Sequence, residues 1–273
     1  MKNLLLLLLI GHFTSFTLMS QNKFNQVDEN GLKQGAWKKY HDGDSVVKYE
    51  GSFKDDKAVG LFTHYYSNGA VRVKIVHGPG LVSRAVNYWP DGSVMGKGKY
   101  VGEQKDSTWL YFDQFSTKIA EEYYIEGKKY GNWKVYYPSG TLMEERIFEN
   151  DMENGLFKQY YENGKLYREA TFVNGGQEGK VTFYHENGQI DAQGMYHKDV
   201  KEGLWKTFDD KGELMMERMY VKGVPTDSDR DIILEDSNNY YKKDRFTIED
   251  VHGEDNLEIP DKKEEKRAKK SRE

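Results

Sequence analysis

Histidine and carboxylate side chains are the residues of this sequence that could bind a metal ion or transfer a proton. The chain has 7 histidines, and no two of them are four residues apart. That spacing is the one by which a helix places two imidazoles on a zinc ion. The 45 acidic residues are spread along the chain and are not gathered as an acid/base pair. The pattern therefore predicts no metal-ligating residue and no acid/base pair.

Nucleophiles and phosphate-binding loops can be searched for in the same way. The chain has no cysteine, and no serine lies within a G-x-S-x-G elbow. The glycines of VHGPG (76–80) and GKGKY (96–100) do not follow a phosphate-loop pattern. We therefore expect no catalytic residue, no cofactor-binding residue and no cofactor, and a protein that is not an enzyme.

Composition limits the classes of partner. The 273-residue chain has a formal net charge of −5, which does not favour binding to nucleic acid or to an anionic membrane surface. Apolar residues make up 37% of the sequence, which is low for one globular core, whereas aromatic residues reach 14%. This combination indicates thin sheets whose apolar surface consists of large amphipathic rings.

The first twenty residues have the composition of a secretory signal peptide. One lysine precedes an unbroken apolar run, Leu4 to Ile10, and a small residue, Ser20, precedes polar Gln21. The alternative is a retained N-terminal anchor. No later stretch is apolar enough to cross a membrane, so the mature chain is predicted to have no transmembrane span. With no cysteine there is neither a lipid anchor nor a disulfide. We expect export in a bacterium, to the periplasm, the outer-membrane surface or the medium.

The elements of the chain repeat with a fixed period. GNWKVYYPSG at 131–140 returns as GLFKQYYENG at 155–164. With the first residue of this decapeptide as position 0, eight units begin 23 to 25 residues apart, which is typical of a repeat architecture. Position 0 is occupied by Gly35, Gly60, Ser83, Ser107, Gly131, Gly155, Gly179 and Gly203.

Rings and glycines recur at three further positions. Position +2 holds Trp37, Phe62, Ala85, Trp109, Trp133, Phe157, Val181 and Trp205. Position +5 is aromatic in every unit: Tyr40, Tyr65, Tyr88, Phe112, Tyr136, Tyr160, Tyr184 and Phe208. Position +9 is glycine in six units: Gly69, Gly92, Gly140, Gly164, Gly188 and Gly212. We interpret these as structural repeat residues, and they leave the binding surface unknown.

Each unit is predicted to form one β-hairpin. Aromatic-rich stretches such as WKVYY favour strands, and turns such as SNG and ENG place glycine where a type I turn is followed by a left-handed residue. Eight hairpins side by side give an all-β fold, an elongated single-layer antiparallel sheet. Position +17, again mostly aromatic, ends the second strand.

The sequence does not determine to which face of the sheet the rings at +2 and +5 point. Positions +2 and +5 differ by an odd number, so a regular strand points them to opposite faces. Either a bulge intervenes or both faces carry rings. Lysines at +3 are expected opposite glutamates at +14, as pairs that set the register on a wet face. These residues are Lys38, Lys134, Lys158 and Lys206, and Glu121, Glu145, Glu169 and Glu217.

Two features depart from the repeat. His41 and His185 occupy position +6, where other units carry Tyr66, Trp89, Tyr137 or Tyr161, and we expect them to act as stacking rings. The stretch HGPGLVSR (77–84) loses the aromatic residue at +17. It is predicted to be a tolerated irregular link, and the alternative is a kink that shapes a binding surface.

The pattern G-x-W-x-x-Y-Y-x-N-G resembles the MORN repeat variant of bacterial proteins often labelled YwqK-type antitoxins. GLFKQYYENGKLYREATF (155–172) and GNWKVYYPSGTLMEERIF (131–148) carry the resemblance, which covers about 35–223. It implies a curved single-layer sheet and a non-catalytic binding role. The missing turn glycine in YFDQFSTK, and the loss of the +2 ring in two units, depart from the pattern locally. The antitoxin label transfers poorly, because a cytoplasmic antitoxin needs no signal peptide.

These observations divide the chain into a signal peptide (1–20), a lead-in (21–34), the repeat domain (35–223), a C-terminal cap or extension (224–252) and a charged tail (253–273). The favoured function is an exported, non-catalytic scaffold that binds a protein in the cell envelope. One alternative is a repeat protein that binds a cell-wall glycan, since rings stack on sugar faces. Another is an antitoxin or immunity protein that neutralises a toxin by direct binding.

Overall fold

The computed structural model describes residues 23–43 and 45–226, which fold entirely as strands and turns. The predicted signal peptide, most of the predicted cap and the charged tail lie outside these residues. The strands are β1 (Gln26–Val27), β2 (Lys33–Tyr40), β3 (Val47–Lys54), β4 (Lys57–Tyr65), β5 (Val71–His77), β6 (Val82–Tyr88), β7 (Val94–Val101), β8 (Gln104–Phe112), β9 (Lys118–Ile125), β10 (Lys128–Lys129), β11 (Gly131–Tyr136), β12 (Leu142–Glu149), β13 (Met152–Glu153), β14 (Gly155–Tyr160), β15 (Leu166–Val173), β16 (Gly176–Gln177), β17 (Gly179–Tyr184), β18 (Ile190–His197), β19 (Val200–Phe208), β20 (Leu214–Val221) and β21 (Val224–Pro225).

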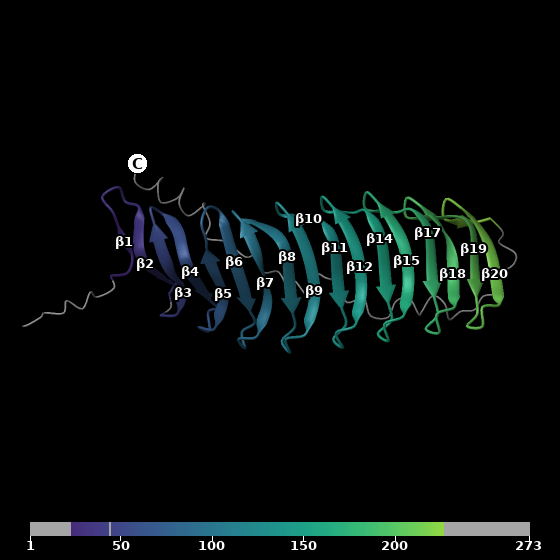
Figure 1. The fold of residues 1–273 in the computed structure, drawn as a ribbon, viewed down its shortest axis with the longest axis horizontal. Helices are drawn as coiled ribbons and strands as arrows, with labels where there is room; N and C mark the ends of the chain where they lie inside the picture. The colour runs from purple at the N-terminus through teal and green to yellow at the C-terminus, as the bar shows by residue number, and fades with distance from the viewer. Residues whose placement is uncertain (1–22, 44, 227–273) are drawn as a thin grey trace, which may run out of the picture.

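The long strands form one antiparallel sheet in which each strand pairs with the next along the chain. The eight expected units are the hairpins β2–β3, β4–β5, β6–β7, β8–β9, β11–β12, β14–β15, β17–β18 and β19–β20. Figure 1 shows the hairpins side by side along the long axis of the molecule. The predicted all-β sheet of tandem hairpins is confirmed.

The turn inside each hairpin has the predicted geometry. In β11–β12 the N–H of Gly140 donates to the carbonyl of Tyr137 at 2.8 Å, and Gly140 has a φ of 84°. This is a four-residue turn followed by a left-handed residue. In the fourth unit Ser116, with a φ of 66°, takes the same role and bonds to Asp113. The loss of the turn glycine there leaves the hairpin intact.

Tight two-residue turns link one hairpin to the next. Ile125 pairs with Lys128, and the intervening Glu126 and Gly127 both have positive φ, 50° and 82°. This is the backbone of a type I′ turn, whose twist matches that of paired strands. Asn150–Asp151 and Lys198–Asp199 adopt it without glycine. Six of the eight links have this geometry, whereas the link after β5 spans residues 78–81 and in the link 102–103 only Gly102 has a positive φ.

Position 0 bends seven of the eight units, all but the one that begins at Ser83. Gly131 has a φ of 65°, and in the fourth unit Ser107 has a φ of 61°. The register between neighbouring hairpins shifts at this level, for example between Gln193 and Met195. An extra residue with left-handed backbone is a β-bulge, which bends the strand. Position 0 is thus the point where the short link arm of such a unit turns away from its long hairpin arm.

Both faces of the sheet carry rings. A second bulge, between positions +4 and +5, places its extra residue on the returning strand, so the outgoing strand keeps its alternation. In β11 the side chains of Trp133 and Val135 are buried, whereas those of Lys134 and Tyr136 are half-buried on the opposite side. We call the face of the +2 side chains the inner face and that of the +3 side chains the outer face.

Stacked rings form the core of the inner face. Where position +2 is a ring, it packs against +17 rings: Tyr124 lies edge-on to Trp133 at 5.3 Å, and Phe148 is tilted against Trp133 at 4.9 Å between centroids. The same contacts join Trp37 to Phe53, Phe53 to Phe62, Tyr100 to Trp109 and Tyr196 to Trp205. Edge-to-face pairs add about 0.5–1.5 kcal/mol each beyond their buried area.

Glycine at position +15 makes room for the next +2 ring. A Cβ added to Gly98 would lie 2.2 Å from the Trp109 ring, and one added to Gly194 would lie 2.3 Å from Trp205. Gly51 makes the same approach to Phe62. Where position +2 is small, position +15 is larger: Ile75 pairs with Ala85. Between these units the two positions share one volume.

We expect Gly98→Ala to destabilise the protein by about 1–3 kcal/mol, because the methyl group must displace a fully buried indole. Urea unfolding followed by tryptophan fluorescence measures this loss. Gly176→Ala is the matched control, since its Cβ would meet only the flexible carboxylate of Asp199 at 3.2 Å. Equal losses for the two variants would contradict the shared-volume interpretation.

Candidate binding surfaces

The +2 tryptophans are enclosed by lysines that the sequence search overlooked. Lys105 Nζ lies 5.0 Å from the Trp109 ring centroid, Lys129 Nζ 4.7 Å from Trp133, and Lys201 Nζ 4.2 Å from Trp205. In the first unit Lys33 covers Trp37 at 5.3 Å. All four lysines stand at position −2, so the pattern K-x-[GS]-x-W was readable in the sequence. The lysine stem shields the ring while the ammonium lies over its face.

The buried indole N–H groups are also satisfied within the repeat. Trp109 Nε1 donates to the carbonyl of Lys99 at 3.0 Å, and Trp133 Nε1 to that of Tyr123 at 3.0 Å. Trp205 Nε1 bonds to Met195 in the same way, at 3.2 Å. The acceptor is always the +16 carbonyl of the preceding unit. Since ring and N–H are both occupied, these tryptophans are structural and offer no face to a ligand.

A buried polar cluster interrupts the aromatic core between the fourth and fifth units. Glu122, only 1% exposed, lies on β9 and accepts a hydrogen bond from Tyr124 Oη at 2.8 Å. Lys105 Nζ donates to Tyr111 Oη at 2.7 Å beside it. Burial lowers the pKa of Lys105, which the Glu122 carboxylate opposes. Burial, together with Glu122, raises the pKa of Tyr111 and Tyr124. The carboxylate and the ammonium compensate each other inside the core.

A second polar cluster lies one unit further on. Arg146 on β12 pairs with Glu144 and Glu153, and its guanidinium lies 5.0 Å from the Phe157 ring. On the other side of that ring, the Arg168 guanidinium lies at 5.1 Å and Nη2 bonds to Gln177 at 2.7 Å. Phe157 is therefore held between two guanidinium groups. The buried apolar residues fall into two groups on either side of this point.

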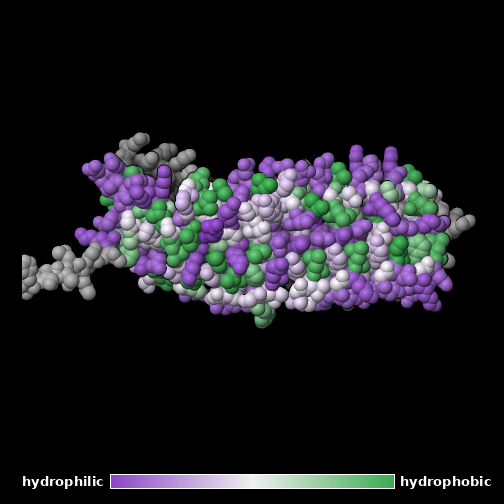
Figure 2. All heavy atoms as spheres, viewed as in Figure 1, coloured by the Kyte–Doolittle hydropathy of each residue, from purple (hydrophilic) through white to green (hydrophobic). Residues whose placement is uncertain are grey.

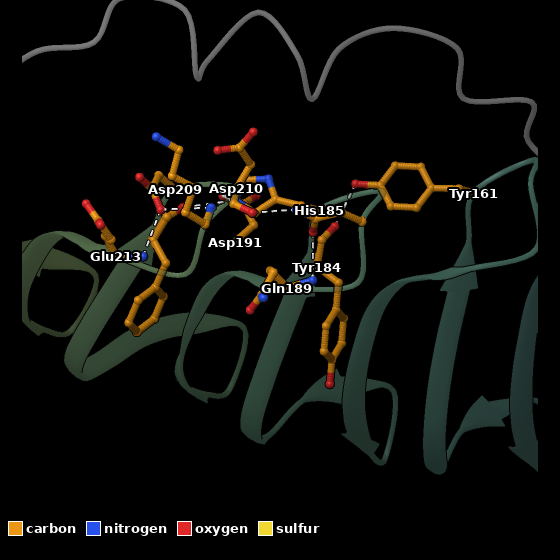
Figure 3. A network of polar contacts seen from close by, with 11 residues as sticks. Tyr161, Tyr184, His185, Gln189, Asp191, Asp209, Asp210 and Glu213 are labelled. Atoms are coloured by element: carbon orange, nitrogen blue, oxygen red, sulfur yellow. Dashed lines mark hydrogen bonds and ion pairs between the residues drawn. The ribbon is translucent and has the colours of Figure 1, made fainter.

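Position +6 forms a row of hydrogen bonds between successive turns. Tyr161 Oη donates to the Tyr184 carbonyl at 2.6 Å (Figure 3). His185 Nε2 lies 2.9 Å from the Phe208 carbonyl. Tyr66, Trp89 and Tyr137 bond to the following unit in the same manner. Because a carbonyl only accepts, Nε2 of His185 carries the hydrogen.

The structure thus gives the +6 histidines a different role from the stacking we expected. The imidazoles of His185 and His41, like the phenols around them, join one turn to the next. Two units have aspartate at +6. Asp209 instead accepts bonds from Lys211 and Glu213 within its own turn, and Asp113 does the same. The variation at +6 therefore does not mark a binding site.

The link at 77–84 continues the sheet. β5 and β6 pair from Val73–Asn87 to His77–Ser83 without a register shift, and Gly78 N–H bonds to the Val82 carbonyl at 2.8 Å. His77 replaces the missing +17 ring, with its imidazole 5.2 Å edge-on to Phe62. Its Nδ1 lies 2.9 Å from Ser83 Oγ. This supports a tolerated variant link over a kink.

The outer face carries the predicted charged pairs. Lys134 is opposite Glu145, Lys158 opposite Glu169, and Lys206 opposite Glu217. Glu121 lies beside Lys134 of the next unit, so acidic and basic residues alternate across units. Lys206 Nζ reaches Glu217 at 2.6 Å, but both side chains are about 40% exposed, 37% and 42%. Such pairs set register and contribute little to stability.

Apolar side chains also lie exposed on the outer face, at positions +1 and +16. Leu61 and Val76 are Cα partners and are 53% and 52% exposed. With Val59 we call them the N-terminal outer patch. Leu204 and Met219 are partners at the same positions, and with Met195 and Val221 they form the C-terminal outer patch. Figure 2 shows hydrophobic residues in separate groups among hydrophilic ones along the molecule.

Within the described part of the chain, no group of three or more histidine or acidic residues is placed to hold a metal ion. Residues 23–43 and 45–226 also contain no helix of the length and apolarity needed to cross a bilayer.

We expect Glu122→Leu to cost about 3–5 kcal/mol, because it leaves the Lys105 ammonium buried without its counter-charge. Chemical unfolding of purified protein measures the loss. Glu121→Gln changes the neighbouring carboxylate on the outer face and should cost less than about 1 kcal/mol. A comparable loss in the two variants would contradict the assignment of Glu122 as the core carboxylate.

His64 should make the fold sensitive to acid. Burial, with help from Arg72, His77 and Lys48, lowers its pKa from 6.5 to about 4. Between these values the unfolded chain binds a proton that the folded chain does not, so stability falls as pH falls through this window. From pH 7 to pH 5 the loss is about 2 kcal/mol. In unfolding measured at both pH values, His64→Phe should reduce this loss, whereas His197→Gln, at an exposed site, should not.

No curated protein sequence matches this chain. Solved structures that match at a TM-score of 0.27 are "Crystal Structure of TarM" (11% identity, 37% of this chain and 20% of that one) and a TarM mutant from S. aureus in complex with Fondaparinux, alpha-GlcNAc-glycerol and UDP (10% identity, 35% and 19%). The chain thus spans about a fifth of TarM. A porin-like protein from Bacteroides uniformis matches at a TM-score of 0.18, with 10% identity over 74% of this chain and 95% of that one. Similarity at these scores supports no functional argument.

The family described as "MORN repeat variant" matches residues 129–150, 153–174, 177–198 and 201–222. These stretches coincide with the last four hairpins and their link arms. The first four hairpins share the turns, the position-0 bend in three units and the ring stack, although the family match does not extend to them. Repeats of this family often bind proteins or membranes. Residues 129–222 therefore carry four tandem units that match the MORN repeat variant family.

Proposed function

We propose that this chain is an exported, non-catalytic scaffold that binds a protein partner of the cell envelope through the outer face of its sheet. The observation that carries the proposal is the exposure of apolar cross-strand pairs, such as Leu61 with Val76, on a face otherwise covered by charged residues. Apolar side chains grouped and rimmed by charges are typical of protein interaction sites.

The outer face is favoured because the repeat itself does not use these side chains. On the inner face, the rings pack in the stack and the polar groups bond within the Glu122 and Arg146 clusters. Position +6 is used between turns. Positions +1 and +16, by contrast, vary between apolar pairs and the charged pair Arg84–Lys99 without loss of sheet pairing. Freedom to vary is what a recognition surface on a repeat scaffold requires.

Export rests on the N-terminal sequence: one lysine, the apolar run Leu4 to Ile10 and the small residue Ser20. The mass of the protein isolated from the envelope tests it, because cleavage near residue 20 removes the apolar segment and a retained anchor does not.

Glycan binding is the weaker alternative. Sugar-binding repeats present ring faces to solvent, whereas Trp109, Trp133 and Trp205 are buried on the inner face under lysines. Titration with peptidoglycan fragments or capsular polysaccharide, followed by tryptophan fluorescence, separates the two. A saturable shift would favour the glycan function.

An antitoxin or immunity role would use the same outer face on one specific toxin. Its support is the family resemblance, and a toxin gene adjacent to the gene for this chain would favour it over a general scaffold role.

For the scaffold role we expect the double variant Leu61→Glu/Val76→Lys to reduce capture of the envelope partner at least about tenfold, because it replaces an apolar contact with a solvated ion pair. The new pair keeps opposite charges across the strands, so folding is preserved. Lys158→Ser/Glu169→Ser, on the charged row, is the matched control and should retain capture. Capture is measured by pull-down from envelope extract with quantitative mass spectrometry. If neither wild type nor control recovers a partner above background, the scaffold function is wrong.

A further inference from the structure

The alternation of charge on the outer face breaks in the second and third units. Position +14 is glutamate in the fourth, fifth, sixth and eighth units, but here it is Lys74 and Lys97. Lys74 pairs with Thr63 and Val86 across the strands. Lys97 pairs with Val86 and Leu110. The second and third units therefore lack the opposite charges that face each other in the fifth, sixth and eighth.

The two ammonium groups lie over aromatic rings. Lys74 Nζ is 5.7 Å from the Tyr88 ring centroid, and Lys97 Nζ is 5.4 Å from that of Phe112. Both lysines are exposed. A ring attracts an ammonium group and fixes its place, but it carries no net charge. The positive charges are thus held at the surface without being neutralised, and each ammonium keeps its N–H donors for a ligand.

Arg84 adds a third positive charge between the two lysines. It is exposed on β6, where it lies directly opposite Val76 on one side and Lys99 on the other. Like charges directly opposite each other destabilise strand pairing. Asp106 neutralises Lys99 at 2.6 Å. Among the residues that the structure places, neither Arg84 nor the two lysines form an ion pair. Since neighbouring strands are about 4.8 Å apart, these three positions lie within about 10 Å of one another.

These three side chains, Lys74, Arg84 and Lys97, form a basic outer patch beside the N-terminal outer patch. Arg84 is the cross-strand partner of Val76, and Lys74 lies two residues before Val76 on the same face of β5. Val76 and its partner Leu61 are aliphatic, and the nearby rings lie under the lysines. These residues therefore offer no free ring on which a base or a sugar could stack.

We propose that the basic outer patch and the N-terminal outer patch together bind an acidic segment of a protein partner. Two or more carboxylates of this segment lie beside the three cations, and an apolar side chain packs on Leu61 and Val76. The proposal rests on the scaffold function proposed above and gives the chemistry of its partner. Carboxylates compensate the charges that the free sheet leaves uncompensated, and they steer the partner to this part of the outer face.

An anionic membrane fits this patch less well than a protein segment does. The positive stretch is bounded on both sides, by Glu50 on β3 and by Glu121 on β9. With neighbouring strands about 4.8 Å apart, it spans about 30 Å at most. A flat anionic surface laid on the outer face also meets the glutamates at position +14 of the later units, which repel it. A protein segment of limited width avoids them.

Carbodiimide crosslinking tests the contact directly, because it joins an amine only to a carboxylate that touches it. The full-length chain is incubated with envelope extract, and the captured partner is crosslinked and mapped by mass spectrometry. We expect Lys74 and Lys97 to be joined to acidic residues of the partner. Lys206 and Glu217, 2.6 Å apart, become joined within the chain and serve as the internal control. A captured partner that is joined to other lysines and never to these two would overturn the proposal while the scaffold function stands.

Charge reversal measures the contribution of the basic outer patch. Lys74→Glu/Lys97→Glu should reduce capture of the partner at least about tenfold, because it brings like charges together. Neither new glutamate faces an acidic residue across the strands, so folding is preserved, which thermal unfolding verifies. Lys128→Glu/Lys180→Glu, at exposed lysines of later units, changes the net charge equally and should retain capture. An equal effect of the two double variants would overturn the proposal.

Further outcomes separate this inference from the scaffold function and from lipid binding. Loss of capture in Leu61→Glu/Val76→Lys but not in Lys74→Glu/Lys97→Glu would exclude an acidic partner at the patch and leave the scaffold function standing. Recovery of no partner by the unmodified chain would contradict both. Co-sedimentation of the unmodified chain with phosphatidylglycerol vesicles, abolished by Lys74→Glu/Lys97→Glu, would assign the patch to a lipid surface and overturn the proposal.

Discussion

The burial of a +2 ring in six of the eight units, in the angle made by the bend at position 0, is the interaction on which the sheet depends. A single layer of strands has no opposing layer, so its rings must be covered by the same chain. The link arm does this: the −2 lysine lies over the indole, and the +17 rings flank it. The indole N–H donates to the +16 carbonyl, which also accepts the backbone N–H at position −1. The bend at position 0, the +2 ring, the −2 lysine and the +16 carbonyl therefore depend on one another. The removal of any of them exposes the others.

Much of this fold could be predicted from the sequence. The repeat period predicted the hairpins, and the glycines at +9 predicted the turns. The lysines at +3 predicted the register between the two strands of a hairpin. The parity of +2 and +5 could not be resolved, because the bulge lies on the returning strand and its extra residue has no distinctive type. The +6 bonds were missed because tyrosine, tryptophan and histidine look alike as rings, whereas their shared property here is a polar hydrogen.

The polar residues of the inner face were the least predictable part. Glu122 and Arg146 occupy position +15, where other units carry Gly98, Ala170 or Gly194 but also Ile75 or Arg218, and a charge in a strand is typical of a solvated face. Their compensating charges stand at position −2: Lys105 of the same unit lies near Glu122, and Glu153 of the next unit pairs with half-buried Arg146. A single repeat cannot reveal this, since the compensating charge stands in another repeat position. The candidate binding surface could not be predicted for the opposite reason. The residues at positions +1 and +16 vary between units, so a search for a repeated pattern does not find them.

The +6 bond always spans one unit, from a side chain to a carbonyl 22 to 24 residues ahead. No contact of this row requires a particular partner beyond the next turn. Duplication or loss of whole units would therefore leave every remaining bond intact. The length of the outer face can therefore change in evolution independently of its chemistry. Duplication of one repeat lengthens the sheet, and substitutions at +1 and +16 can then diversify the copies.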